Sequence, residues 1–205
     1  MKKQTLLVTG ITFLLACAAQ AGGQDQLAGS IGEARAEATR TSEQLKATLA
    51  SLTALTKQKE GDLRPAYNTF AAEIPRTDAA ANSTRTRVRW MQGDGLQYFT
   101  DWQNTINGIA NTSLQKKAQK RLDTVKKSYD KVQASMVQAA DKFNPFLSDL
   151  RDIQKTLATD VTAGGVKAVK GTVRSANWNH QYVDKAIKSA LKEMGRMEKE
   201  LSTTA

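Results

Sequence analysis

The chain contains 205 residues, with 30 lysines and arginines against 20 aspartates and glutamates, so that its formal net charge is +10 at pH 7. The single cysteine and the single histidine exclude an intramolecular disulfide, a thiolate zinc site and a metal site built on two histidines. Aromatic residues make up only 6% of the chain, and such a composition can fill a narrow core but not a thick globular one.

Residues 1–21 are organised like a bacterial export signal. Lys2 and Lys3 precede a short apolar run from Leu6 to Ala16, and Ala19-Gln20-Ala21 provides a small-x-small cleavage site. The apolar run is too short for an ordinary transmembrane helix and no second one follows it, so we expect no transmembrane span in the mature chain.

Two cleavage points stay open within this signal. Leu14-Leu15-Ala16-Cys17 resembles a lipobox, in which the cysteine receives lipid and becomes the mature N-terminus. A cut after Ala21 would instead remove Cys17 altogether. Either cut predicts an exported bacterial protein of the periplasm, membrane-anchored as a lipoprotein in the first case, and both argue against nucleic acid as a natural partner.

The first predicted helix runs from about Gln24 to Lys59. Apolar and small residues recur in it at steps of three and four, the spacing that places side chains on one stripe of a helix. They are Leu27, Ile31, Ala34, Ala38, Thr41, Leu45, Thr48, Leu52 and Leu55. Glu60-Gly61-Asp62 ends this helix, because glycine readily takes the left-handed conformation, and Asp62 can cap the segment that follows.

The second segment, from about Leu63 to Ala110, is predicted to be helical with interruptions. Pro65 is tolerated in the first turn, whereas Pro75 and Gly93-Asp94-Gly95 are each able to kink or break a helix. Between them, Arg85-Thr86-Arg87-Val88-Arg89-Trp90 alternates with period two, as a strand does. Because the sequence offers no second alternating segment to pair with it, a helix is favoured.

The third helix is expected to begin at a cap offered by Asn111-Thr112-Ser113, to continue to about Asp160 and to bend at Pro145. From Leu122 to Leu157 its apolar residues keep steps of three and four without a miss, and so long a stripe must pack against other helices. They are Leu122, Val125, Tyr129, Val132, Met136, Ala139, Phe143, Phe146, Leu150, Ile153 and Leu157.

Gly164-Gly165 indicates the turn before the fourth helix, in which Gly171 is able to separate the first turns from the rest. The stripe of this helix contains Val166, Val169, Val173, Ala176, His180, Val183, Ile187, Ala190, Met194, Met197 and Leu201. His180 therefore falls in a packing seam, where a polar residue is typically a specificity determinant rather than a catalyst.

These segments predict an all-α fold, an elongated antiparallel helical bundle or coiled coil of long helices, with residues 22–205 as a single domain. Short connections between long helices force neighbours to run antiparallel. We expect the N-terminus, the 110–113 connection and the C-terminus at one end, and the 60–62 and 160–165 turns at the other.

Nothing in the chain predicts an enzyme, and we expect no catalytic residue, no cofactor and no metal. A glycine-rich run at 164–172 lacks the Gly-Lys-[Ser/Thr] of a phosphate loop.

Positive charge is concentrated in the second half of the chain. Residues 24–110 carry ten bases and ten acids, whereas residues 111–205 carry eighteen bases and ten acids. The bundle brings the start of the third helix beside the end of the fourth, so a basic surface is predicted there. Its candidate residues are Lys116, Lys117, Lys120, Arg121, Lys126, Lys127, Lys192 and Arg196. This surface is either an ordinary solvated face or a site that attracts anionic lipid, cell-wall polymer or an acidic partner.

Trp178 and Tyr182 lie one turn apart on the face of the fourth helix that points away from its stripe. We favour the interpretation that another helix of the bundle covers them, since long bundles bury more than one stripe. The alternative is an exposed patch that binds a partner, because aromatic residues are typical interface anchors.

Four sets of short runs carry a family resemblance. They are Gly61-Asp62-Leu63 with Tyr67, Phe99-Thr100-Asp101-Trp102, Ser113-Leu114 leading through Lys127-Ser128-Tyr129, and Phe143-Asn144-Pro145-Phe146-Leu147-Ser148-Asp149-Leu150. Over nearly the whole mature chain they resemble a bacterial family known as domain of unknown function twenty-nine fifty-nine. The resemblance implies an exported or lipid-anchored protein rich in long helices, and it implies no activity, cofactor or catalytic residue.

These features predict a non-enzymatic cell-envelope protein that acts through its helical surfaces, as a spacer, scaffold or regulatory partner. Its expected partners are an envelope protein or an anionic membrane surface, and oligomerisation stays open. The alternative is a periplasmic holdase-type chaperone with a positive cradle for unfolded proteins. Against that alternative, the sequence shows no wide apolar face and no separate β body for oligomerisation.

Overall fold

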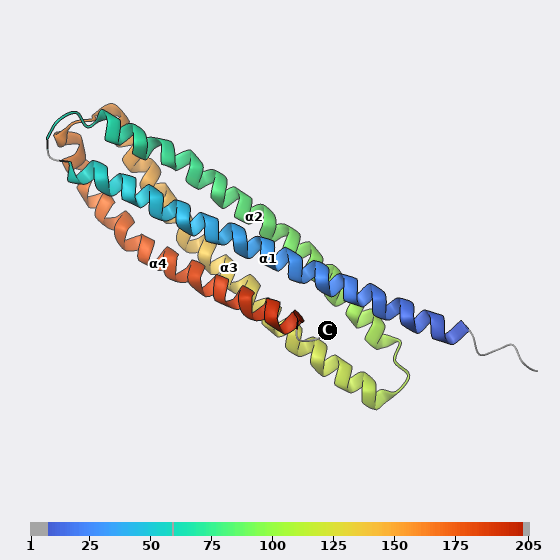
Figure 1. The fold of residues 1–205 in the computed structure, drawn as a ribbon. Helices are drawn as coiled ribbons and strands as arrows, with labels where there is room; N and C mark the ends of the chain where they lie inside the picture. Colours follow the sequence, from blue (N-terminus) through green and yellow to red (C-terminus); the bar gives the residue numbers. More distant parts are fainter. Residues whose placement is uncertain (1–7, 59, 203–205) are drawn as a thin grey trace, which may run out of the picture.

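The computed structural model describes the backbone of residues 8–58 and 60–202, and the side chains of these residues from position 22 onward. Over these ranges the chain forms four long helices and no strand, which confirms the all-α prediction (Figure 1). They are α1 (Val8–Lys57), α2 (Arg64–Asn107), α3 (Thr112–Thr159) and α4 (Ala163–Ser202). The α1 helix begins well before Gln24, the predicted start, and the Cys17 side chain lies outside the described residues.

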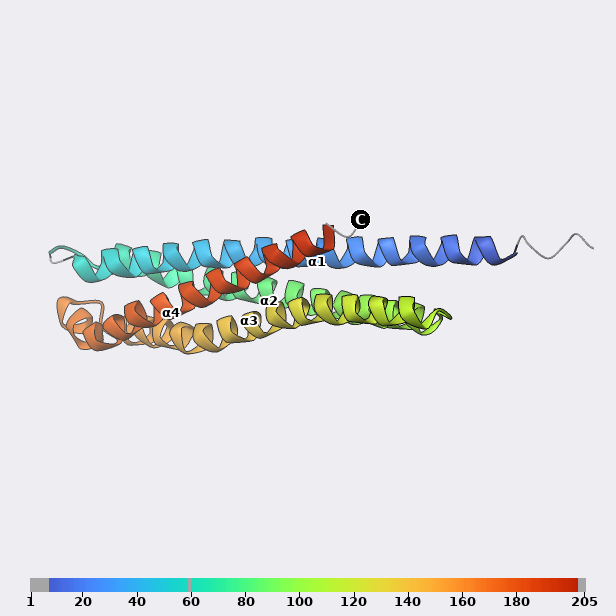
Figure 2. The ribbon, with the colours of Figure 1, turned by 90° about the horizontal axis from the view of Figure 1, so that it is seen from below.

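The four helices lie side by side in an elongated antiparallel bundle. Figures 1 and 2 show the α1–α2 and α3–α4 connections at one end, and the α2–α3 connection and the start of α1 at the other. The α4 helix ends part of the way along the bundle, so that α1, α2 and α3 extend beyond it. Among the described residues, no helix is long and apolar enough to cross a membrane.

Asn111 caps α3 as predicted, whereas the N-cap position of α2 is Leu63 and Asp62 lies one residue before it. Gly61 has a left-handed φ angle of 83°, but it lies in the α1–α2 connection beyond the end of α1 at Lys57, so it permits the turn rather than capping the helix. The Asp62 carboxylate accepts a hydrogen bond of 2.9 Å from the backbone N–H of Arg64. The Asn111 side chain accepts one of 3.0 Å from the backbone N–H of Leu114 at the start of α3. Each supplies an acceptor to a backbone donor that the first helical turn leaves without a partner.

Helix interruption was overestimated from the sequence, because the glycines that suggested breaks lie inside helices. The α2 helix continues through Pro75, through 85–90 and through Gly93 and Gly95, and α4 continues through Gly171. Gly165 belongs to the first turn of α4 rather than to the turn before it. A Cβ atom on Gly165 would lie 2.0 Å from the carbonyl oxygen of Asp160, so this glycine permits a close backbone approach.

The helices pack as two closely joined hairpins. Contact is most extensive between α1 and α2 and between α3 and α4, whereas α2 and α3 touch least. Threonine pairs hold the first hairpin together. Thr48 and Thr77 hydroxyls lie 2.8 Å apart and those of Thr41 and Thr84 lie 2.9 Å apart. Short side chains allow two helices to approach closely, and the paired hydroxyls satisfy one another inside the bundle.

The core is divided into two clusters along the bundle axis. The distal cluster, toward the α1–α2 and α3–α4 connections, includes Leu45, Leu52, Leu55, Phe70, Ile74, Phe143, Phe146, Leu150, Ile153, Leu157, Val173, Val183 and Ile187. The proximal cluster, toward the α2–α3 connection, includes Leu27, Ile31, Ala34, Met91, Tyr98, Phe99, Ile106, Leu122, Val125, Tyr129, Val132, Met194, Met197 and Leu201. These residues include most of the predicted stripes, which confirms the packing faces of all four helices.

Candidate functional site

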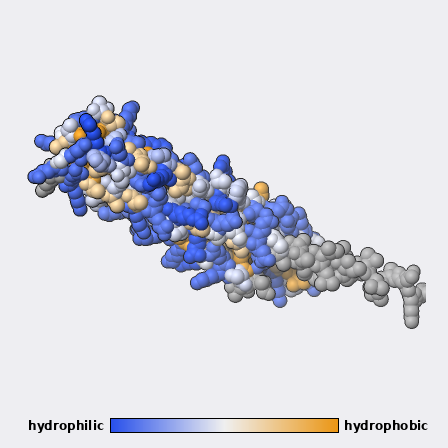
Figure 3. Space-filling model, turned by 45° about the horizontal axis from the view of Figure 1, so that its top comes forward, coloured by the Kyte–Doolittle hydropathy of each residue, from blue (hydrophilic) through white to orange (hydrophobic). Residues whose placement is uncertain are grey.

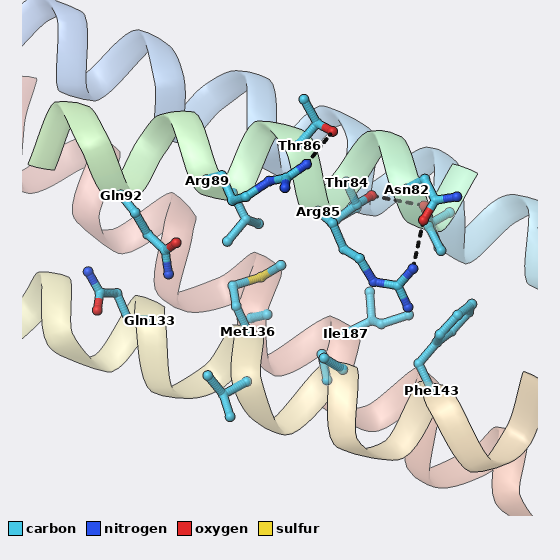
Figure 4. A pocket seen from close by; sticks show the side chains of 18 residues that line it. Asn82, Thr84, Arg85, Thr86, Arg89, Gln92, Gln133, Met136, Phe143 and Ile187 are labelled. Atoms are coloured by element: carbon cyan, nitrogen blue, oxygen red, sulfur yellow. Dashed lines mark hydrogen bonds between the residues drawn. The ribbon is translucent and has the colours of Figure 1, made fainter. Parts of the chain in front are cut away.

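A cavity of about 570 Å³ lies where the two core clusters meet, between α2 and α3. Figure 4 shows side chains from both helices lining it, and its lining includes Ala38 of α1 and Ile187 of α4. Small-molecule sites in proteins typically have volumes of about 300–1,000 Å³. The space is therefore large enough to hold a ligand.

Small residues at core positions explain why this cavity forms. Each helix places short side chains at this level, where elsewhere it places leucine, phenylalanine or methionine. They are Ala38, Thr41, Ala81, Thr84, Ala139 and Ala190. Because α2 and α3 are also the least closely packed neighbours, these side chains do not fill the space between them. Met136, a predicted stripe residue, is only half-buried here and lines the cavity, while Ser135 is buried beside it.

The rim of the cavity is polar and carries two arginines. Arg85 donates hydrogen bonds to the side-chain oxygens of Asn82, at 2.8 Å, and Asn144, at 3.0 Å. Its guanidinium carbon also lies 6.0 Å from the centre of the Phe143 ring. Arg89 donates to the Thr86 hydroxyl at 3.3 Å. Within the described part of the chain, neither arginine has a carboxylate oxygen within 4.0 Å, so both positive charges lack a counterion.

Arg87, between these two, lies in a different environment. It forms a 2.6 Å ion pair with Glu33 of α1, and its guanidinium carbon lies 4.5 Å from the ring centre of Trp90. Because residues 85–90 are helical, the three arginines of this run do not share one environment. Arg85 and Arg89 lie at the cavity, whereas Arg87 neutralises an acid on α1. Figure 4 also shows Gln92 and Gln133 facing each other across the gap between α2 and α3.

The predicted basic surface is present as an exposed row with few counterions. Lys116, Lys117, Lys120, Lys126, Lys127 and Lys192 are exposed, and none forms an ion pair among the described residues. The other two candidates are neutralised. Arg121 pairs with Glu200 at 3.4 Å and Arg196 pairs with Glu193 at 2.7 Å. The first of these pairs joins α3 to α4, so the helices meet as predicted. The face in Figure 3 is mainly hydrophilic, with small separate hydrophobic patches.

The prediction that another helix covers Trp178 and Tyr182 is wrong. Their side chains are 60% and 46% exposed, and their rings meet edge to face with centres 5.8 Å apart. The bundle is a ring of four helices in which each contacts only its two neighbours, and the neighbours of α4 cover its stripe but not this face. The aromatic pair stays available to a partner.

His180 lies at the edge of the α3–α4 seam rather than deep inside it. It is half-buried, and its ring centre lies 5.9 Å from that of Phe146. Burial is the main cause that lowers the pKa of His180 below its ordinary value of 6.5, and the nearby lysines Lys46 and Lys188 act in the same direction. Asp184 opposes this shift. The described residues contain no cluster of three or more histidine, cysteine, aspartate or glutamate side chains that could hold a metal.

Sequence reasoning did not find the cavity, although its signals are present in the sequence. The stripe of the first helix contains alanine or threonine at 34, 38, 41 and 48, and the periodicity counts these as filled positions whatever their size. The alternation of the run at 85–90 is typical of a strand. On a helix, the useful spacing is the four residues between Arg85 and Arg89, which places both on one face.

A family model described as "Protein of unknown function (DUF2959)" matches residues 20–201. The resemblance inferred from the short runs is thereby confirmed. Comparison with curated proteins and with solved structures finds no match to this chain.

Proposed function

We propose that this chain, which belongs to the DUF2959 family of proteins of unknown function, is a non-enzymatic protein of the bacterial cell envelope that acts through its helical surfaces. We further propose that it is exported by the signal at residues 1–21 and that its basic surface holds it against an anionic membrane. In this proposal it serves as a spacer or scaffold between that membrane and an envelope partner.

The observation that carries this proposal is the exposed lysine row at the start of α3. Five lysines between 116 and 127 are exposed without an ion pair in the described chain, at the end of the bundle where α1 begins. Each lysine near an anionic surface contributes about 1 kcal/mol of attraction. A basic patch is the kind of signal that reinforces a lipid anchor such as one on Cys17.

Vesicle sedimentation tests the proposal. A chain beginning at residue 22 retains every residue of both core clusters. We expect it to sediment with vesicles rich in anionic lipid but not with neutral vesicles, and to be released as salt rises toward about 0.5 M, where screening is strong.

Matched charge variants locate the binding surface. Replacing Lys116, Lys117, Lys120 and Lys127 by Gln should abolish sedimentation, with Arg121 kept because it pairs with Glu200. The control variant replaces Lys155, Lys167, Lys170 and Arg174, four exposed bases toward the opposite end, and should sediment nearly as wild type. Equal losses in both variants, or sedimentation that is indifferent to salt, would reduce the lysine row to an ordinary solvated face.

The holdase alternative receives less support. The large exposed apolar residues of the described chain are Trp90, Leu96, Leu114, Val137, Trp178 and Tyr182. They are distributed over α2, α3 and α4. A holdase needs one wide apolar face to bind an unfolded client, and these residues do not form one. Suppression of aggregation of a denatured outer-membrane protein at near-stoichiometric amounts would nevertheless favour the holdase over the scaffold.

A further inference from the structure

The cavity between α2 and α3 has an apolar wall. Its sides include Val88 of α2, Met136 and Phe143 of α3, and Ile187 of α4. Val137, at the surface of α3, is 58% exposed and extends the apolar lining to the mouth. An apolar chain that enters such a space exchanges contact with water for contact with carbon, which is favourable in proportion to the area it buries.

The mouth of the same cavity carries uncompensated positive charge. Arg85 and Arg89 are spaced four residues apart on α2, hence on one face of that helix. Their hydrogen-bond partners are neutral amides and a hydroxyl. A guanidinium group without a carboxylate partner favours an anionic ligand and can hold a carboxylate or a phosphate with two hydrogen bonds. An apolar cavity with a positively charged rim thus matches a molecule with an apolar tail and a negative head.

The surrounding packing favours a single flexible chain over a rigid ring system. The α2–α3 face is the most loosely packed of the bundle, so its side chains can adjust to a slender occupant. Met136, at the wall, is unbranched and adapts its shape readily. Gln92 and Gln133 offer neutral hydrogen-bonding groups beside the two arginines.

We propose that this cavity binds a single-chain anionic amphiphile, with the acyl chain between α2 and α3 and the head group at Arg85 and Arg89. This site is separate from the lysine row on which the proposed membrane attachment depends. Failure of one proposal therefore leaves the other standing.

Calorimetric titration of the chain beginning at residue 22 tests the proposal, with oleate below its aggregation concentration as the probe. We expect saturable binding of one oleate. Oleyl alcohol, which has the same chain and no charge, should bind about tenfold more weakly or worse. Within the length that the cavity covers, each methylene removed from the fatty acid should weaken binding about fourfold. Oleoyl lysophosphatidate should also bind, and its affinity relative to oleate identifies the preferred head group.

Arginine variants provide the matched comparison. Replacing both Arg85 and Arg89 by Gln should weaken oleate binding at least about tenfold, because charge-assisted hydrogen bonds are lost. Arg87→Gln removes one positive charge from the same stretch of helix. Because Arg87 pairs with Glu33 instead of lying at the cavity, this variant should stay within about twofold of wild type. Ala139→Leu should reduce binding by filling the wall. Three results would each overturn the proposal: no saturable oleate binding by the wild type, equal affinity for oleyl alcohol, or equal losses in the Arg85/Arg89 and Arg87 variants.

Discussion

Gly95 offers a sharp test of how α2 and α3 fit together. A Cβ atom added to this buried residue would lie 2.3 Å from the Tyr129 hydroxyl oxygen and 2.4 Å from its ring carbon Cζ. The Tyr129 hydroxyl also donates a 2.9 Å hydrogen bond to the carbonyl oxygen of Met91. The tyrosine ring therefore sits against a stretch of helix that has no side chain, and Gly95→Ala must displace it.

The size of the effect follows from opposing terms. Overpacking a filled core costs about 1–3 kcal/mol, and loss of the Tyr129 hydrogen bond costs about 1 kcal/mol more. Alanine returns about 1 kcal/mol through its higher helix propensity. We therefore expect Gly95→Ala to lower the free energy of unfolding by about 1–3 kcal/mol. Gly93 is the matched control, because a Cβ there meets no atom within 4 Å. Gly93→Ala should stabilise the protein by up to about 1 kcal/mol.

Urea unfolding followed by circular dichroism at 222 nm measures both changes as shifts of the midpoint at constant slope. A second background separates the clash from any helix effect. When Tyr129 is first replaced by Leu, the space beside position 95 opens, and Gly95→Ala should then become neutral or stabilising. If Gly95→Ala and Gly93→Ala shift the midpoint equally, or if the penalty persists without the tyrosine, the packing described for this contact is incorrect.

Two further predictions concern other positions. Burial lowers the pKa of His180 in the folded state. Between its ordinary pKa and this lower one, the unfolded chain therefore binds more protons than the folded chain. As the pH falls through that window, His180 lowers the free energy of unfolding. His180→Leu should be neutral or stabilising at pH 7.5 and should lose less stability than wild type between pH 7.5 and pH 5; an unchanged pH dependence of the urea midpoint would contradict this. Gly165→Ala should destabilise the protein strongly, because the added Cβ would meet the Asp160 carbonyl oxygen. Gly171→Ala should stabilise it slightly, because a Cβ there has open space around it. Thermal unfolding that ranks the two variants in the reverse order would contradict the packing at the α3–α4 turn.

The packing faces were predictable because the periodicity depends on the polarity of each residue, and polarity can be taken directly from the sequence. Leu122, Val125 and Phe146 are buried as the α3 stripe requires. Periodicity does not report size. In the pattern, Ala139 and Ala190 count as stripe positions just as leucines would, although they leave space beside them. The pattern therefore does not indicate the cavity.

The roles of glycines are ambiguous for a related reason. In a single sequence, a glycine that breaks a helix and a glycine that admits a neighbouring side chain look the same. Gly61 lies outside any helix, in the α1–α2 connection, where its φ angle of 83° suits a turn. Gly95 is of the second kind, and its partner Tyr129 lies on another helix. Only the tertiary contact distinguishes the two.

The division of the core into two clusters has a consequence for the order in which the chain can fold. Both clusters require α4, since the distal cluster includes Ile187 and the proximal cluster includes Leu201. During synthesis, the α1–α2 hairpin therefore emerges with its apolar faces still uncovered, and neither cluster can close until the last helix has been made. A polypeptide whose core includes residues of its final helix cannot complete that core while it grows. If the protein is exported as we propose, late completion of the core favours passage through a secretion channel, because the full bundle cannot form before α4 has been made.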